Sequence, residues 1–376
     1  MRPTNAPSQA DDRPAAAAGP GPVLRVRNLS VCFRTDRGVV TAVEDASFDV
    51  RASETLGIVG ESGCGKTVTS KAIMRLLPER TSFLKPGSSI ALAGRSGGPD
   101  LDLARAPESV LRGVRGARIA MVFQEPMTSL NPVFTVGWQI EEALKYHTTL
   151  DARARRARVV EMLRLVEIPN PERRAGEYPH QLSGGMRQRV MIAIALCCEP
   201  EVLIADEPTT ALDVTIQAQI LALMDNLRRR LSTAIVLITH NLGVVAQVCD
   251  RVMVMYAGRV VETGSVGDIF HRPHHPYTAA LLHSIPKAGA RRHAQRLPVI
   301  PGIVPSLTDL PPGCRFSDRC ASRRDACGAG EPDLTDAPTP SDSPGVARAV
   351  RCFFPIHHAA PPAAGNAHTS PPRADP

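Results

Sequence analysis

The sequence contains no apolar run long enough to span a lipid bilayer, which takes about 18 to 20 mostly apolar residues. Its longest run, residues 190–198, has nine. The first residues are rich in proline and alanine, and they lack the basic and then apolar pattern of a secretory signal. From these absences we expect a soluble protein that stays in the cytoplasm, rather than a chain that crosses the membrane by itself.

Lysine is scarce, so the formal net charge of +7 comes almost wholly from arginine. Arginines cluster at 153–158 and 228–230 within segments of helical pattern, which indicates solvated helix faces. Contact with anionic lipid headgroups is a second interpretation, and nucleic acid is a third. The 376 residues suffice for two or three domains with a packed core. Nine cysteines in a cytosolic chain indicate thiols or metal ligands before disulfides.

The most informative stretch is residues 56–67, Leu-Gly-Ile-Val-Gly-Glu-Ser-Gly-Cys-Gly-Lys-Thr. It matches G-x-x-x-x-G-K-[ST] between a predicted strand and a predicted helix, which is the context that this phosphate-binding motif needs. Backbone N–H groups of the loop and the helix N-terminus would hold phosphate oxygens. Lys66 would reach the β- and γ-phosphates, and Thr67 would bind Mg²⁺. The sequence therefore predicts a nucleoside triphosphate site. The residues expected to contact nucleotide here are Gly60, Glu61, Ser62, Gly63, Cys64, Gly65, Lys66, Thr67 and Val68.

Composition sets the two ends of the chain apart and divides its first third. Residues 1–22 and 357–376 are rich in proline and alanine and predict disordered tails. Apolar and polar positions alternate over 23–50, which predicts two or three antiparallel strands. Residues 78–116 are rich in glycine, proline and serine, so we expect a surface insertion with little core.

The middle of the chain combines helices with buried strands. A helical pattern over 137–182 predicts a mostly helical subdomain, at about 125–185. Short apolar strands are expected at 56–59, 118–123, 201–205 and 234–239, with a hairpin over 252–263. Strands that alternate with helices predict a parallel α/β sheet whose ligands bind at the carboxyl ends of the strands.

Polar residues follow these strands directly. Asp206 and Glu207 close the strand at 201–205, where one carboxylate would hold Mg²⁺ and the other would activate water. Neighbouring residues of a strand point to opposite faces, so the chain must turn here. Gln124 and His240 also follow strands. Each alone would be read as a structural polar residue, but together with Lys66 they indicate one catalytic edge.

Residues 182–188, Leu-Ser-Gly-Gly-Met-Arg-Gln, open an apolar helix. A serine and two glycines at a helix N-terminus form a second site for anions. One chain rarely needs two such sites for one triphosphate, so we expect Ser183 and Gly185 to complete the site of a partner subunit.

With these motifs in this order, residues 23–270 resemble the ATP-binding subunit of ABC transporters. The matching motifs are Walker A at 60–67, the Q-loop at Gln124, the signature at 182–188, Walker B at 202–207, the D-loop at 211–213 and the switch histidine at His240. The resemblance implies a P-loop NTPase of the α/β class, with a RecA-like core, an antiparallel β subdomain and a helical subdomain.

The resemblance also implies roles for single residues. Glu207 would be the general base, His240 would position γ-phosphate and water, and Asp206 with Gln124 would serve Mg²⁺. Phe33 would stack on adenine; core packing is its alternative. Further nucleotide contacts would come from Ser183, Gly184, Gly185 and Asp213. Cys64 departs from the family, which usually has a small polar residue there, but that position contributes mainly its backbone.

Residues 271–286 and 301–320, together with 124–132, resemble the ATPases of oligopeptide/dipeptide importers. We call residues 271–356 the C-terminal extension. This resemblance implies import of peptides, while relatives also carry nickel or glutathione. It implies a second ATPase subunit, a paralogue rather than a copy, two transmembrane permease subunits and an extracytoplasmic binding protein. The chain would lie at the cytoplasmic face of the inner membrane, without nucleic acid.

Four cysteines fall in this extension: Cys314, Cys320, Cys327 and Cys352. The paired C-x₂₋₄-C spacing of structural zinc sites is absent. Four thiolates in a proline-rich segment with little core still favour a metal, and some members of the subfamily carry a [4Fe–4S] cluster. The cluster, zinc or another metal, and free thiols all remain open. Four other cysteines lie in apolar patterns and are expected in the core: Cys32, Cys197, Cys198 and Cys249.

Other functions are weaker fits. A soluble ABC-type ATPase acting on DNA or ribosomes would carry a long inserted coiled coil or two cassettes, and neither pattern is present. The signature at 182–188 argues against a P-loop kinase or another soluble NTPase. An exporter is disfavoured by the missing membrane segments, although some exporters are also split.

Overall fold

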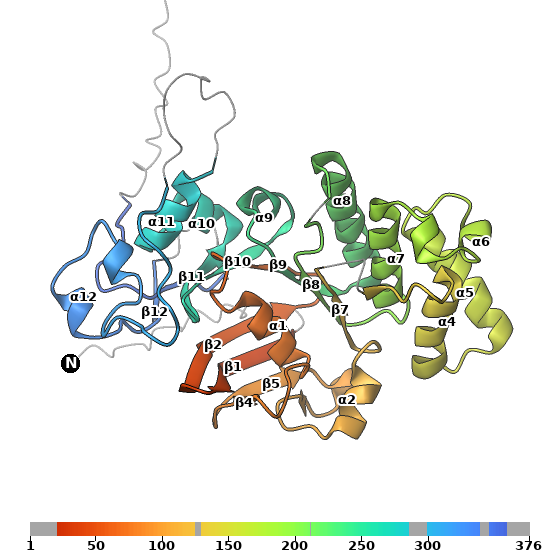
Figure 1. Ribbon diagram of the computed structural model, residues 1–376, viewed down its shortest axis with the longest axis horizontal. Coiled ribbons are helices and arrows are strands. Elements are labelled where there is room, and N and C mark those ends of the chain that lie inside the picture. Colours follow the sequence, from red (N-terminus) through yellow and green to blue (C-terminus); the bar gives the residue numbers. More distant parts are fainter. Residues whose placement is uncertain (1–20, 125–128, 211, 286–298, 339–345, 359–376) are drawn as a thin grey trace, which may run out of the picture.

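The structure is a computed structural model that describes residues 21–124, 129–210, 212–285, 299–338 and 346–358. Most of the two predicted tails and Ala211 of the D-loop lie outside these residues. Figure 1 shows two sheets, with one group of helices and the C-terminal extension at opposite ends of the larger sheet.

The smaller sheet is antiparallel, with the strand order β2-β1-β5-β6, and β4 pairs with β1. Its strands are β1 (Pro22–Thr35), β2 (Gly38–Arg51), β4 (Ser82–Leu84), β5 (Ser89–Leu92) and β6 (Leu101–Asp102). The antiparallel strands predicted for 23–50 are thereby confirmed as β1 and β2. The two pair along most of their length, from Leu24 opposite Val50 to Thr35 opposite Gly38.

The surface insertion predicted for 78–116 is wrong. This segment forms β4, β5, β6 and helix α2 (Glu108–Val114), and it contributes Ile90, Leu92 and Leu111 to the core. The glycines and prolines that dominate its composition fall between these short elements. Ile90 and Leu92 alternate with partly buried neighbours in a strand of four residues, which is too short for the periodicity to stand out.

The larger sheet has the order β12-β13-β11-β10-β3-β9-β8-β7. Its parallel strands are β3 (Thr55–Val59), β7 (Ile119–Val122), β8 (Val202–Asp206), β9 (Ala234–Ile238) and β10 (Arg251–Tyr256). The hairpin partner β11 (Arg259–Ser265) is antiparallel, as are β12 (Thr335–Asp336) and β13 (Ala349–Val350). Every residue of β3, β8 and β9 is buried, because elements pack against both faces. The predicted parallel sheet is confirmed.

Helices occupy the region where the helical subdomain was predicted. They are α4 (Val136–His147), α5 (Ala152–Leu165), α6 (Pro171–Arg174) and α7 (Gly184–Leu196). Side chains of Thr135 and Asp151 cap the first two by accepting hydrogen bonds from Trp138 N and Ala154 N. The helices gather at one end of the larger sheet in Figure 1, and the apolar faces of α4, α5 and α7 share a core with β7 and β8.

The arginine clusters lie on two helices, where some of their members form ion pairs. Arg155 pairs with Glu141 and Arg158 with Glu199, both around α5. Arg228 pairs with Asp225 on α8 (Val214–Leu231).

The remaining helices are α1 (Lys66–Ile73), α9 (Leu242–Val248), α10 (Val266–His271), α11 (Pro276–His283) and α12 (Ala326–Ala329). The extension packs on the sheet through an aromatic cluster, in which Tyr277 and Phe316 lie against Tyr256 of β10. All three rings are buried. Within the described ranges, every helix is too short or too polar to cross a bilayer.

Candidate functional site

The phosphate loop, residues 60–67, joins the end of β3 to the start of α1. Gly60, Gly63 and Gly65 have φ values of 153°, 79° and 102°, which L side chains rarely adopt. A Cβ at Gly60 would lie 2.2 Å from the Met255 carbonyl oxygen, so glycine is required there by space as well as by φ. The backbone therefore wraps tightly at the N-terminus of α1.

Lys66 is folded back onto this loop. Its Nζ donates hydrogen bonds to the carbonyl oxygens of Gly60, at 2.8 Å, and Glu61, at 3.0 Å. The neighbouring Cys64 side chain is fully buried in the core, and burial raises the pKa of its thiol. Cys64 is therefore a neutral packing residue whose carbonyl faces the β10–β11 turn, where it accepts a hydrogen bond from Gly258 N.

Two side-chain oxygen groups that could bind a metal ion lie beside each other next to the loop. The Thr67 hydroxyl donates a hydrogen bond to Asp206 Oδ1 at 3.2 Å. Asp206 ends β8 and is only 3% exposed. Burial raises the pKa of this carboxyl group, and the Thr67 hydroxyl offsets only part of that effect. A hydroxyl and a carboxylate at this spacing are the hard oxygen ligands that Mg²⁺ prefers.

Glu207 turns away from the strand. Its φ of 48° confirms that the chain turns directly after Asp206. The Glu207 carboxylate lies 3.0 Å from His240 Nδ1 and accepts a hydrogen bond of 2.8 Å from the Thr210 hydroxyl. Gln124 Nε2 lies 3.5 Å from the same group. Burial alone would raise the pKa of Glu207, but the hydrogen bonds from His240 and Thr210 bring it below its ordinary value. This carboxylate is therefore ionised at neutral pH.

Most of the polar side chains just described line one cavity of about 620 Å³, a size typical of small-molecule sites. Its lining residues are Ala42, Ser62, Gly63, Gly65, Lys66, Thr67, Val68, Gln124, Glu207, Thr210, His240 and Leu307. The structure thus brings together residues that the sequence placed at the ends of separate strands. Their individual roles remain predictions.

Thr210 and Leu307 were not predicted from sequence. Thr210 follows Glu207 by three residues, so the spacing was a usable signal for a hydroxyl that returns to the carboxylate. Leu307 lies in the C-terminal extension, far along the chain, and nothing in its local sequence points to this cavity.

Other predicted contacts lie elsewhere. Phe33 is half-buried in β1 against the core, opposite Val40, and the described lining of the cavity does not include it. Ser183 caps α7 by accepting a hydrogen bond from Met186 N, and Asp213 caps α8 in the same way. Gly185 also has a packing reason, since a Cβ there would lie 2.9 Å from Ile216 Cγ2.

The signature turn is open to solvent. Ser183 and Gly184 are exposed, and among the described residues that line the cavity around Lys66 neither is present. Within one chain, the two predicted anion sites are therefore separate.

The nine cysteines are free thiols. Cys314, Cys320, Cys327 and Cys352 line one enclosed cavity of about 20 Å³, which is room for about one water molecule. Burial raises the pKa of Cys352 to about 11. Among the residues that the structure describes, no group of three or more His, Cys, Asp or Glu side chains is arranged to hold a metal ion. The predicted [4Fe–4S] cluster is therefore not supported by this geometry. Cys32 and Cys197 are buried in the core as expected, and Cys198 and Cys249 are partly buried against it.

Comparison with known proteins gives the family. Residues 43–210 match the family described as ABC transporter, and residues 261–327 match the oligopeptide/dipeptide transporter C-terminal region. The chain is 52% identical over 317 residues to a putative peptide import ATP-binding protein of Brucella ovis, covering 83% of this chain and 93% of that one. It is 53% identical over 305 residues to the dipeptide transport ATP-binding protein DppD of Bacillus subtilis, covering 81% and 88%.

Solved structures agree. The dimeric structure of MJ0796, a bacterial ABC transporter cassette, superposes with a TM-score of 0.56 at 26% identity, covering 65% of this chain and 98% of that one. The cbiO1 protein of Clostridium perfringens, part of an ABC transporter complex, gives 0.55 at 27% identity, covering 67% and 92%. The chain therefore belongs to the ABC transporter ATPases, in the group that carries the oligopeptide/dipeptide transporter C-terminal region.

Proposed function

We propose that this chain binds and hydrolyses ATP to power the import of peptides through separate permease subunits. The observation that carries the proposal is the single cavity lined by Lys66, Thr67, Gln124, Glu207 and His240. The peptide substrate rests on the relatives, which are named for peptide or dipeptide import. Nickel and glutathione are the alternative cargoes.

The chemistry follows from the contacts of each group. Lys66 leaves the carbonyls of Gly60 and Glu61 to bind the β- and γ-phosphates. Thr67 and Asp206 would hold Mg²⁺, which would supply positive charge against the phosphates. The Glu207 carboxylate accepts a proton from the attacking water.

His240 and Thr210 orient the Glu207 carboxylate and keep it ionised. His240, whose side chain is 64% exposed, lies at the open side of the cavity, where γ-phosphate would enter.

A second ATPase subunit completes the site in this proposal. Ser183 and Gly185 begin α7 on an exposed turn, apart from the chain's own cavity, and helix N-termini bind anions. Two chains facing each other would place the turn of one on the triphosphate of the other. The dimeric neighbour MJ0796 supports this arrangement. A paralogue is the proposed partner.

The permease contact is proposed for the segment after Gln124. Val133, Phe134 and Trp138 are 70%, 37% and 42% exposed, and the rings of Phe134 and Trp138 stack 3.9 Å apart. Exposed apolar side chains gathered in this way are typical of protein interfaces. The chain would thus be peripheral at the cytoplasmic face of the membrane.

The test uses the complex purified with its permeases, second ATPase and binding protein. Glu207→Gln should lower ATP hydrolysis by at least 100-fold and leave ATP affinity nearly unchanged. Lys66→Ala should lose ATP binding. Hydrolysis should rise with added di- or oligopeptides and not with nickel or glutathione. Wild-type turnover by Glu207→Gln would remove Glu207 from the role of general base.

We also propose that the four cysteines of the extension bind a metal group, with a [4Fe–4S] cluster first and zinc second. The proposal is supported by the presence of four thiols in one proline-rich segment, which together line one small cavity. Because the described side chains are not arranged to hold a metal ion, the thiols would have to move to bind one. Anaerobic purification followed by iron, sulfide and zinc analysis tests it. A colourless protein free of all three would leave the thiols as packing residues.

A further inference from the structure

We propose that Arg319 and Tyr277, both in the C-terminal extension, are positioning residues that hold the phosphate loop in its nucleotide-binding conformation. The inference rests on the proposed function, since it concerns how tightly that loop binds ATP. Neither residue lines the cavity among its described walls, so both act through Glu61.

Glu61, the second residue of the loop, is held at three points. Its N–H donates a hydrogen bond to Tyr277 Oη at 2.9 Å. Its carbonyl oxygen accepts one from Lys66. Its carboxylate forms a two-pronged ion pair with Arg319, at 2.6 Å to Nη1 and 3.0 Å to Nη2. Two of these three partners come from more than 200 residues further along the chain.

Arg319 is itself rigidly placed. Its side chain is 5% exposed. Its Nε donates to the Pro301 carbonyl oxygen at 2.9 Å, and Nη1 lies 3.3 Å from Tyr256 Oη. A guanidinium with all three nitrogens engaged gives the carboxylate one orientation, which a lysine cannot reproduce. Tyr277 is fully buried, so its hydroxyl is also fixed.

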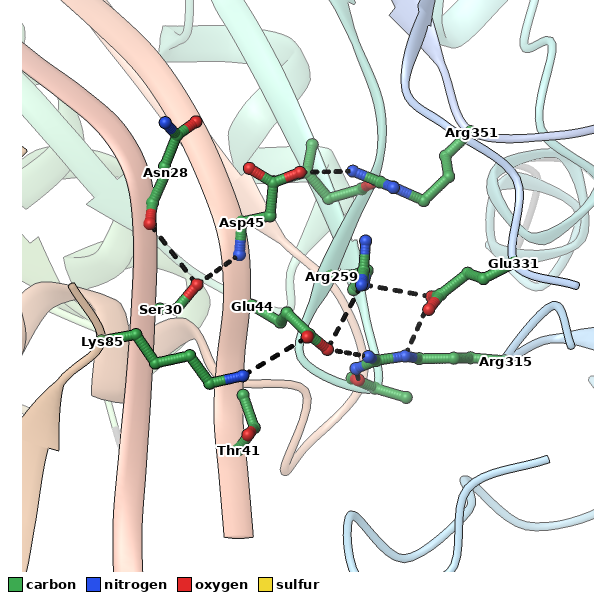
Figure 2. Close-up of polar contacts among 12 residues, drawn as sticks. Asn28, Ser30, Thr41, Glu44, Asp45, Lys85, Arg259, Arg315, Glu331 and Arg351 are labelled. Atoms are coloured by element: carbon green, nitrogen blue, oxygen red, sulfur yellow. Dashed lines mark hydrogen bonds and ion pairs between the residues drawn. The ribbon is translucent and has the colours of Figure 1, made fainter. Parts of the chain in front are cut away.

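The same short segment has a second anchor beside the loop. Arg315 donates to the Ala257 carbonyl oxygen at 2.6 Å, pairs with Glu44 of β2 and lies 3.0 Å from Glu331. Figure 2 shows Arg315 and Arg259 held between these two carboxylates. Arg315 thus binds the β10–β11 turn at Ala257. The next residue of that turn, Gly258, donates its N–H to the carbonyl oxygen of Cys64 in the phosphate loop.

Residues 314–320 therefore hold the phosphate loop through two sets of contacts, which we call braces. One is the ion pair of Arg319 with Glu61, and the other runs from Arg315 through the β10–β11 turn to Cys64. Leu307 brings the extension to the cavity wall as well. A loop with three glycines at positive φ has many alternative conformations, so outside braces shift its population toward the competent one.

Loss of a brace should weaken ATP binding more than it slows the chemical step, because Lys66 and Glu207 remain. If the loop is competent about one-tenth of the time without the brace, the apparent Kd for MgATP rises about tenfold. The KM for ATP should rise in the same proportion, with kcat changed less than twofold.

The experiment measures MgATP affinity, KM and kcat of the full chain in its transport complex. The test variants are Arg319→Met and Tyr277→Phe. Arg319→Lys should recover only part of the affinity, because a point charge replaces a fork. The matched control is Arg323→Met, since Arg323 lies four residues after Arg319 but is 52% exposed and pairs with the exposed Asp318.

Glu61→Gln tests the brace from the loop side, where the carboxylate is 27% exposed and the fold is less at risk. Its affinity for MgATP should equal that of Arg319→Met. The double variant should bind MgATP no more weakly than either single variant, because both substitutions remove the same ion pair. If Glu61→Gln and Arg319→Met bind MgATP as tightly as wild type while Lys66→Ala loses binding, this inference is wrong but the proposed function stands. Failure of the wild-type complex to bind ATP overturns the proposed function as well.

Discussion

Glu262 on β11 is the buried carboxylate on which the docking of the C-terminal extension depends. It is 0% exposed. Its two oxygens accept hydrogen bonds from His274 N, at 2.7 Å, and His275 N, at 2.9 Å, and Arg348 Nη2 lies 3.3 Å away. Glu262→Ala would leave two buried N–H groups and a guanidinium that is 1% exposed without this partner.

The cost can be worked from these contacts. Removal of one partner of a buried ion pair costs about 3 to 5 kcal/mol, and each buried donor left unsatisfied costs about 1 to 3 kcal/mol. Because the two figures overlap, we expect Glu262→Ala to lower the free energy of unfolding by about 5 kcal/mol. Glu262→Gln keeps one acceptor oxygen but turns an amide group toward the other donor, so about 3 kcal/mol is expected.

Tryptophan fluorescence would report on the wrong region, because the single tryptophan lies on α4 in the helical subdomain. The assay must therefore follow the extension itself. Hydrogen exchange of peptides covering residues 262–283, followed through urea unfolding, gives the local free energy. Glu172→Ala is the control, since its 64% exposed pair with Arg164 should contribute less than about 1 kcal/mol. A loss below about 1 kcal/mol in Glu262→Ala would refute the reasoning.

Three further outcomes are expected. Burial alone would raise the pKa of Glu44, but Arg259, Arg315 and Lys85 outweigh burial and hold the pKa below its ordinary 4.5. The extra stability of wild type over Glu44→Gln should therefore be complete above pH 4.5 and shrink as the pH falls below that value. Urea titrations at several pH values measure this difference, and a difference that grows in acid would contradict the reasoning. Gly60→Ala should lose ATP binding and melt lower, because its Cβ would collide with a backbone carbonyl of β10, whereas Gly87→Ala, also at positive φ but with open space around it, should cost only about 1 to 2 kcal/mol. Trp138→Ala should keep ATP binding but reduce co-purification with the permeases, while Tyr146→Ala, which removes an aromatic side chain that is 75% exposed, serves as its control.

Much of the nucleotide site could be predicted from sequence because its determinants are local. The phosphate loop follows from glycines, a lysine and a threonine at fixed spacing, and the strand-end residues Gln124, Glu207 and His240 follow from the rule that parallel strands present their carboxyl ends at one edge. The structure brings these residues to one cavity.

The contacts that sequence reasoning missed are those between distant segments. The pair of Glu61 and Arg319 spans 258 residues, and no local pattern marks either member. Strands β4 to β6 were missed because elements of two to four residues are too short to show a period. The presence of four cysteines in one proline-rich segment predicted a shared metal, but only the folded chain shows how little room lies between them.

The pairing of β13 with β11 has a practical consequence. Residues 349 and 350 cover the outer edge of a strand that would otherwise present unpaired N–H and C=O groups to other molecules. A truncated version that stops near residue 270 would expose that hydrogen-bonding edge together with the aromatic surface of Tyr256. Such a fragment should self-associate into aggregates during expression, so the recombinant ATPase is best produced with its C-terminal extension.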